Sequence, residues 1–251
     1  MNEITAPVPP QIPLSSAGGK GLLPLGQKPE EHESIPNLLV AIEAILRQPR
    51  RLMFQLRGNG GGKLIGILLF GMLLCSLIYG VVVGTFSMGT QLWAAPIKIA
   101  GGLFLSGAIC LPSLYIFACI SGSRAGLREL CGLVAGLLML SSVLLIGFAP
   151  VAWLFSQSTE SVAWMGALHL LFWFIATCFG LRFLVEGFSH SQPRSRAGLS
   201  TWILMFMLVA VQMTAALRPI VGNANSFLPT EKKLFLTHWG DCLNTTSPVS
   251  H

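Results

Sequence analysis

Charged residues are scarce in this 251-residue chain: only 10% are Asp, Glu, Lys or Arg, whereas a soluble globular domain has about 25%. Hydrophobic residues make up 53%, and the mean hydropathy is +0.68. With its long apolar runs, this composition excludes an ordinary soluble domain and predicts a polytopic membrane protein. The net charge of +6 does not indicate a nucleic-acid partner, because the basic residues stand beside apolar runs.

Other absences narrow the choice further. Five of the six cysteines lie within apolar runs and none forms Cys-x-x-Cys, so we expect neither a disulfide framework nor a zinc site. The beginning, "MNEITAPVPPQIPLSSAGGKGLLPLGQKPEEHES", lacks the apolar core of a signal peptide. We predict that residues 1–33 are a disordered cytoplasmic tail, because this segment has too little apolar area to offset the entropy of ordering.

Carboxylates are missing from the interior of the apolar runs. Between Leu64 and Leu217 the only ones are Glu129, Glu160 and Glu186, and all three fall in expected loops. A proton-coupled carrier usually needs an intramembrane acid as its relay, and an intramembrane aspartyl protease needs two. We therefore expect no enzyme, no catalytic residue, no metal site and no cofactor.

One stretch imitates a nucleotide-binding loop: "RGNGGGKLIGILLF", residues 57–70. A phosphate-binding loop requires G-x-x-x-x-G-K-[ST] between a strand and a helix. The spacing from Gly58 to Gly62 is one residue short, and Leu64 replaces the hydroxyl residue that would bind magnesium. We expect no nucleotide, and interpret the glycines as a hinge before a membrane span.

Five apolar segments are long enough to cross a bilayer, and each must be helical because lipid cannot satisfy backbone polar groups. They are Leu64–Phe86, Ile97–Ile120, Leu130–Phe148, Val162–Val185 and Leu199–Leu217. The predicted fold is an all-α, five-span transmembrane bundle over residues 63–218. Residues 219–251 are predicted to form an outside tail with a short interfacial helix.

The basic residues are distributed unequally between the predicted loops. Twelve of the 16 fall on the side that carries the N-terminus. The positive-inside rule then predicts a cytoplasmic N-terminus and an outside C-terminus, which an odd number of spans allows.

A basic amphipathic helix and the glycine hinge are predicted at residues 34–62, before the first span. Ser34 suits its N-cap, and Pro49 should kink or split it. Such a helix lies in the membrane interface, where its cations contact anionic lipid or a partner. The cations in question are Arg47, Arg50, Arg51, Arg57 and Lys63. The alternative, which does not exclude the first, is that its apolar face packs on the ends of the spans.

A second candidate site lies toward the outer side. His169 and Gln212 fall inside spans, and Arg218 follows the last one. Because unpaired polar groups are costly in lipid, we predict an outward-facing polar pocket of these three residues. The commoner alternative is that His169 and Gln212 hydrogen-bond neighbouring helices. Small-residue faces at Gly80-x-x-x-Gly84 and Gly132-x-x-x-Gly136 favour packing within the chain over a dimer.

The segment "IPNLLVAIEAILRQPRRLMFQLR" with its glycine hinge resembles the start of bacterial Yip-like (Ypt-interacting protein) domains. The segments "APIKIAGGLFLSGAICLPSLYIF", "FAPVAWLFSQST" and "QMTAALRPIVG" are similar to a group of bacterial inner-membrane proteins. The resemblance implies five spans in the bacterial inner membrane and no catalytic residues. We predict a non-enzymatic protein that organises lipid or protein partners, including a homo-oligomer. The alternatives are a small-solute channel or carrier and an accessory subunit of a larger membrane complex.

Overall fold

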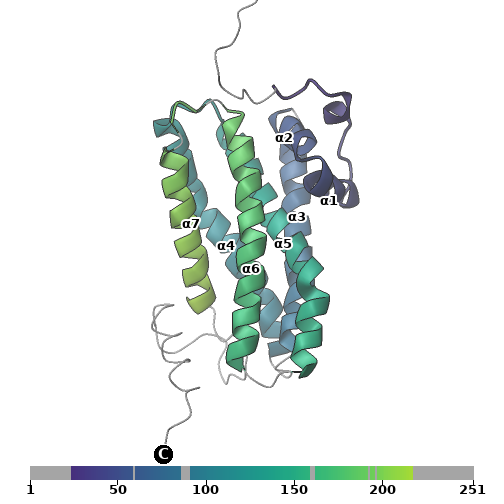
Figure 1. Ribbon diagram of the computed structural model, residues 1–251. Helices are drawn as coiled ribbons and strands as arrows, with labels where there is room; N and C mark the ends of the chain where they lie inside the picture. The colour runs from purple at the N-terminus through teal and green to yellow at the C-terminus, as the bar shows by residue number, and fades with distance from the viewer. Residues whose placement is uncertain are drawn as a thin grey trace, which may run out of the picture.

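A computed structural model describes residues 24–58, 60–85, 91–158, 162–191, 193–195 and 197–216 (Figure 1). Within these ranges every regular element is a helix and no strand occurs, which confirms the predicted all-α fold. In chain order the elements are η1 (Pro29–His32), α1 (Leu38–Arg47), α2 (Pro49–Arg57), α3 (Gly61–Thr85), α4 (Gln91–Ile120), α5 (Leu127–Ser158), α6 (Val162–Ser189) and α7 (Ala197–Ala216).

Helices α3 to α7 are all long and apolar enough to cross a membrane. At about 1.5 Å per residue, even α7, the shortest with 20 residues, extends about 30 Å, the thickness of a hydrocarbon core. The chain is therefore a multi-pass membrane protein, and its described part has five spans, as predicted.

Two predicted span boundaries beside prolines are wrong, the start of the second span, since α4 begins at Gln91 and not at Ile97, and the end of the third. The third span was expected to end at Phe148, before Pro150, yet α5 continues through this proline to Ser158. Proline removes a single backbone donor, and a long helix keeps the hydrogen bonds on both sides of it. The helix therefore extends ten residues beyond the predicted end.

Helix α5 is the centre of the bundle, with most of its apolar length buried. It packs against α3, α4 and α6, while α7 packs against α4 at the periphery (Figure 1). The buried side chains of α5 are small or aliphatic over about three continuous turns, from Gly132 to Ser142, as expected of a helix surrounded by others.

Glycines allow close approaches between these helices. A Cβ atom added at Gly80 of α3 would lie only 2.3 Å from the Cα atom of Pro96 in α4. One added at Gly132 of α5 would lie 2.6 Å from the Leu56 side chain of α2. Both small-residue faces are thus occupied within the chain, which confirms the packing favoured from the sequence.

Helices α1 and α2 are separated at Gln48, whose backbone leaves the helical region directly before Pro49. The predicted split at this proline is confirmed. Helix α1 begins after Asn37, three residues later than the N-cap predicted at Ser34. Residues 24–33, which we expected to be disordered, are ordered and include η1, so that part of the prediction is wrong. Residues 1–23 lie outside the described residues.

Helix α1 lies beside the bundle rather than across its end (Figure 1). A Cβ atom at Gly71 would lie 2.4 Å from Leu38 Cδ1 and 2.7 Å from Met139 Cε. Gly71 is eight residues beyond Lys63, an exposed cation near the start of α3, which corresponds to about 12 Å along the helix. The first turn of α1 therefore packs beside the apolar part of α3, within the first span and not at its end.

The two ends of the bundle differ in composition. We call the end where α3, α5 and α7 begin the basic end: ten of the 11 described Lys and Arg residues belong to it, Lys98 being the exception. The opposite end has exposed tryptophans on three helices, Trp93, Trp153 and Trp164. Tryptophan is enriched at membrane interfaces, so both ends have the composition of a bilayer boundary.

Candidate functional site

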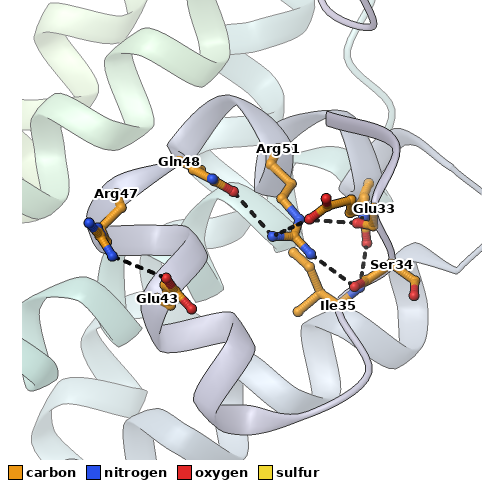
Figure 2. A network of polar contacts seen from close by, with 8 residues as sticks. Glu33, Ser34, Ile35, Glu43, Arg47, Gln48 and Arg51 are labelled. Carbon is orange, nitrogen blue, oxygen red and sulfur yellow. Dashed lines mark hydrogen bonds and ion pairs between the residues drawn. The ribbon is translucent and has the colours of Figure 1, made fainter. Parts of the chain in front are cut away.

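Arg51 is a buried cation at the junction of α1 and α2 (Figure 2). Its Nε and Nη2 donate to the carbonyl oxygens of Glu33 (3.1 Å) and Ser34 (3.0 Å). Its Nη1 donates to Gln48 Oε1 (3.1 Å) and lies 3.3 Å from Glu33 Oε2. The planar guanidinium presents its donors in a fixed fork, so one side chain fastens the chain before α1 to the start of α2.

Gln55, one turn after Arg51, completes this junction. Its side-chain oxygen accepts the backbone N–H of Ile35 (3.1 Å), and its amide nitrogen donates to the Glu33 carbonyl. Residues 33–35 are extended and have no strand beside them, so their backbone groups need other partners. The polar face of α2 provides these partners.

Two further arginines of α2 form ion pairs within the chain. Arg50 Nε lies 2.8 Å from Glu31 Oε1, and the Glu31 carboxylate is almost fully buried. Arg57 Nη2 lies 2.6 Å from Glu129 Oε1 in the first turn of α5. Because a buried carboxylate requires a charged or hydrogen-bonding partner, these pairs hold η1 and α5 against α2.

The five cations predicted to contact lipid or a partner thus divide into two groups. Arg50, Arg51 and Arg57 are engaged in contacts that fold the N-terminal element. Arg47 is exposed and pairs with Glu43 one turn earlier (3.3 Å; Figure 2), and Lys63 is exposed at the start of α3. Contact with lipid or a protein partner stays a prediction for all five cations. Arg50, Arg51 and Arg57 already form hydrogen bonds or ion pairs with residues of the same chain.

The outward face of α1 combines apolar and charged side chains. Leu39 and Leu46 are 79% and 48% exposed, and Glu43 and Arg47 lie on the same side of the helix. The inner face rests on α3 and α5 through small and aliphatic side chains: Ala41, Ala44 and Ile45. Helix α1 is therefore held firmly on one side and presents a mixed surface on the other.

His190, directly after α6, faces this junction. Burial lowers the pKa of its imidazole, and the positive charges of Arg50 and Arg57 lower it further, while Glu186 and Glu31 act in the opposite direction. Its Nε2 is buried and has no hydrogen-bond partner among the described residues. A neutral His190 therefore fits here better than a charged one.

The second predicted site centres on His169. Its Nδ1 lies 2.8 Å from the hydroxyl of Tyr79, a buried side chain of α3. If the hydroxyl donates, the proton of the neutral imidazole is on Nε2, which is buried and without a partner in the described part of the chain. His169 therefore forms a hydrogen bond with a neighbouring helix, which was the alternative to the polar pocket.

The other members of the predicted pocket are not gathered around His169. Gln212 is exposed on α7, a helix that packs against α4, and Arg218 lies outside the described residues. The sequence did not identify three residues that form contacts at these sites: Glu31 with Arg50, Gln55 with residues 33 and 35, and Tyr79 with His169. Proline at the first turn of "PEEH" was a usable signal for η1, and Gln55 follows Arg51 by one helical turn.

Comparisons with protein families, curated proteins and solved structures found no match to this chain.

Proposed function

We propose that this chain is a non-enzymatic integral membrane protein that organises a protein partner within the bilayer, with α1 as the docking element. The observation that carries the proposal is the mixed face of α1, a helix that packs beside the apolar part of the first span. Exposed leucines alone suit lipid tails, but an ion pair between Glu43 and Arg47 beside them is costly in hydrocarbon. A partner helix that covers this face offsets that cost.

The rigidity of α1 supports the same proposal. Its inner face packs on α3 and α5, and the Arg51 junction fixes its connection to α2. A docking surface held in place before binding loses less conformational freedom when the partner arrives. The short helix is thus suited to present a defined surface.

The proposal includes the bacterial inner membrane, a Yip-like character and a cytoplasmic N-terminus. The sequence segments quoted above support the Yip-like part. The concentration of described Lys and Arg residues at the basic end supports the orientation, because such residues favour the cytoplasmic side. A reporter fused at residue 1 should be protected from external reagents in intact cells.

Site-specific photocrosslinking in intact membranes tests the docking element. A photoreactive residue at Leu39 or Leu46 should give a discrete protein adduct, whereas one at Leu208, equally apolar and exposed on α7, should give none. Substituting Arg47→Glu should remove the adduct by placing two acids one turn apart. Adducts with lipid only, at all three positions, would contradict the proposal, and an adduct of twice the chain mass would identify the partner as a second copy.

A second candidate, a small-solute carrier or channel, is favoured by the unpartnered Nε2 of His169. A buried imidazole N–H in a membrane span needs an acceptor, and a water or a polar solute supplies one. His169→Leu should then abolish solute flux into liposomes while leaving the crosslink from Leu39 intact. An accessory subunit of a larger complex would be expected to present its small-residue faces to other chains, but those at Gly80 and Gly132 are filled by this chain itself.

A further inference from the structure

Two loops at the basic end are joined to each other. We call residues 121–126, between α4 and α5, and residues 190–195, before α7, the paired loops; residue 192 lies outside the description. The backbone N–H of Arg194 donates to the Ser121 carbonyl (2.9 Å), and that of Arg124 donates to the Ser191 carbonyl (3.3 Å). The hydroxyls of Ser123 and Ser191 lie 2.7 Å apart. These reciprocal bonds fix the positions of the residues that the loops carry.

Two exposed arginines belong to the paired loops, Arg124 and Arg194, and a third, Arg128, follows in the first turn of α5. The stem of Arg194 lies over Gly122, where a Cβ atom would be 3.3 Å from its Cδ, and Gly122 has a left-handed backbone (φ 67°). Glycine at this position therefore gives the Arg194 stem room to lie across the loop.

These arginines differ from those of α2 in their partners. None of the three forms an ion pair with a carboxylate of the described residues, whereas Arg50 and Arg57 do. The flanking helices contain two acids: Glu129 is already paired with Arg57, and Glu186 forms no ion pair with these arginines. Their positive charge is thus available to an anion from outside the chain.

Exposed apolar side chains lie beside the arginines, so an anion bound by these arginines would also contact an apolar surface. Ile120 at the end of α4 and Leu127 at the start of α5 are 74% and 53% exposed, directly next to the charged loop. Exposed aliphatic residues that border cations are typical of the boundary between hydrocarbon and headgroups. The start of α5 is also open, since a Cβ atom at Gly126 would meet nothing within 4 Å, and its free N–H groups favour negative charge.

We propose that the paired loops bind the phosphate headgroup of an anionic phospholipid, with Arg124, Arg128 and Arg194 as its ligands and its acyl chains along Ile120 and Leu127. The guanidinium fork matches phosphate oxygens in a bidentate way. The apolar border selects a lipid over a soluble anion, because a free phosphate would gain nothing from Ile120 and Leu127. This site is separate from α1, so the test of the lipid site does not depend on whether α1 binds a protein partner.

Native mass spectrometry of the full chain in detergent tests this site with phosphatidylglycerol, phosphatidylcholine and inorganic phosphate as probes. Arg124→Gln/Arg194→Gln should weaken phosphatidylglycerol binding on the order of 30-fold, as expected for two cations near anionic lipid. Lys28→Gln/Arg182→Gln removes the same charge from exposed positions of the basic end outside the loops, and should change binding less than about 3-fold.

The variant is expected to fold, because the bonds between the loops come from the backbone and from serines. A thermal midpoint equal to that of the control variant checks this expectation. If the thermal midpoint falls, Arg124→Lys/Arg194→Lys is used in place of the glutamine variant. Lysine keeps the positive charge but lacks the planar guanidinium, so phosphatidylglycerol binding should weaken by a smaller factor than about 30. Equal loss in the loop and control variants would overturn the proposal. So would phosphatidylcholine binding as tight as that of phosphatidylglycerol, or full displacement by inorganic phosphate.

Discussion

At the basic end, charged and polar groups hold the chain together: Arg51 ties the segment before α1 to α2, and Arg57 ties α2 to α5. At the opposite end the contacts are between rings and backbones. Phe148 stacks on Phe172 with ring centroids 4.7 Å apart, and Gly80 lets α3 approach α4. The four described ion pairs all lie at the basic end, whereas stacked rings and a glycine contact join the helices toward the opposite end.

The most damaging change should be at the opposite end, at Gly80. Gly80→Ala places a methyl group 2.3 Å from the Pro96 Cα, a backbone atom that cannot move aside without shifting α4. We expect a destabilisation of about 3 kcal/mol, at the upper end of overpacking effects. The thermal midpoint in detergent measures it. Gly101→Ala, where a Cβ would meet nothing within 4 Å, is the matched control and should be close to neutral.

At the basic end the corresponding change is Arg51→Gln. It removes the guanidinium hydrogen bonds to the Glu33 and Ser34 carbonyls, and hydrogen bonds from charged groups contribute about 1.5–3 kcal/mol. We expect a loss of about 2 kcal/mol and faster amide exchange in residues 33–37, measured by hydrogen-exchange mass spectrometry. Arg47→Gln, which removes one ion pair within α1 and no contact with another segment, should cost less than Arg51→Gln. Equal effects of the two substitutions would refute the distinction drawn between these arginines.

Sequence reasoning succeeded where one physical rule dominates. Long apolar runs in α3 to α7 can only be spans, and Pro49 separates two helices because it cannot continue the preceding turn. It failed where partners come from distant segments. Nothing near Arg51 in the sequence reveals that residues 33–35 need its donors, and nothing near His169 points to a tyrosine 90 residues earlier. The position of α1 likewise depends on Leu38 meeting Gly71, a contact between two ordinary residues.

The Tyr79–His169 hydrogen bond should contribute less to the free energy of unfolding than the Gly80 contact or the Arg51 junction. Tyr79→Phe removes the hydroxyl and keeps the ring, so the imidazole loses its partner inside the span. Hydrogen bonds between membrane helices contribute roughly 0.6–1.7 kcal/mol, and we expect a loss of about 1 kcal/mol in unfolding free energy, measured by steric trapping in bicelles. Tyr115→Phe, on an exposed side of α4, is the control and should leave the stability unchanged. A loss equal to that of the control would mean that the hydroxyl contributes nothing.

The smallest expected effect is the change in thermal midpoint when His190, at the basic end, is protonated at low pH. The groups that face His190 are Arg50 and Arg57, which oppose its protonation, and Glu31 and Glu186, which favour it, and burial adds to the opposition. Because its folded-state pKa lies below the ordinary value of 6.5, the unfolded chain takes up the proton first as the pH falls. The contribution of neutral His190 is thus fully present above the unfolded pKa and is lost as the pH falls below it. Between about pH 7.5 and about pH 5 the wild-type thermal midpoint should fall further than that of His190→Gln, which stays neutral. Equal falls would show that a positive charge on His190 does not disturb the junction.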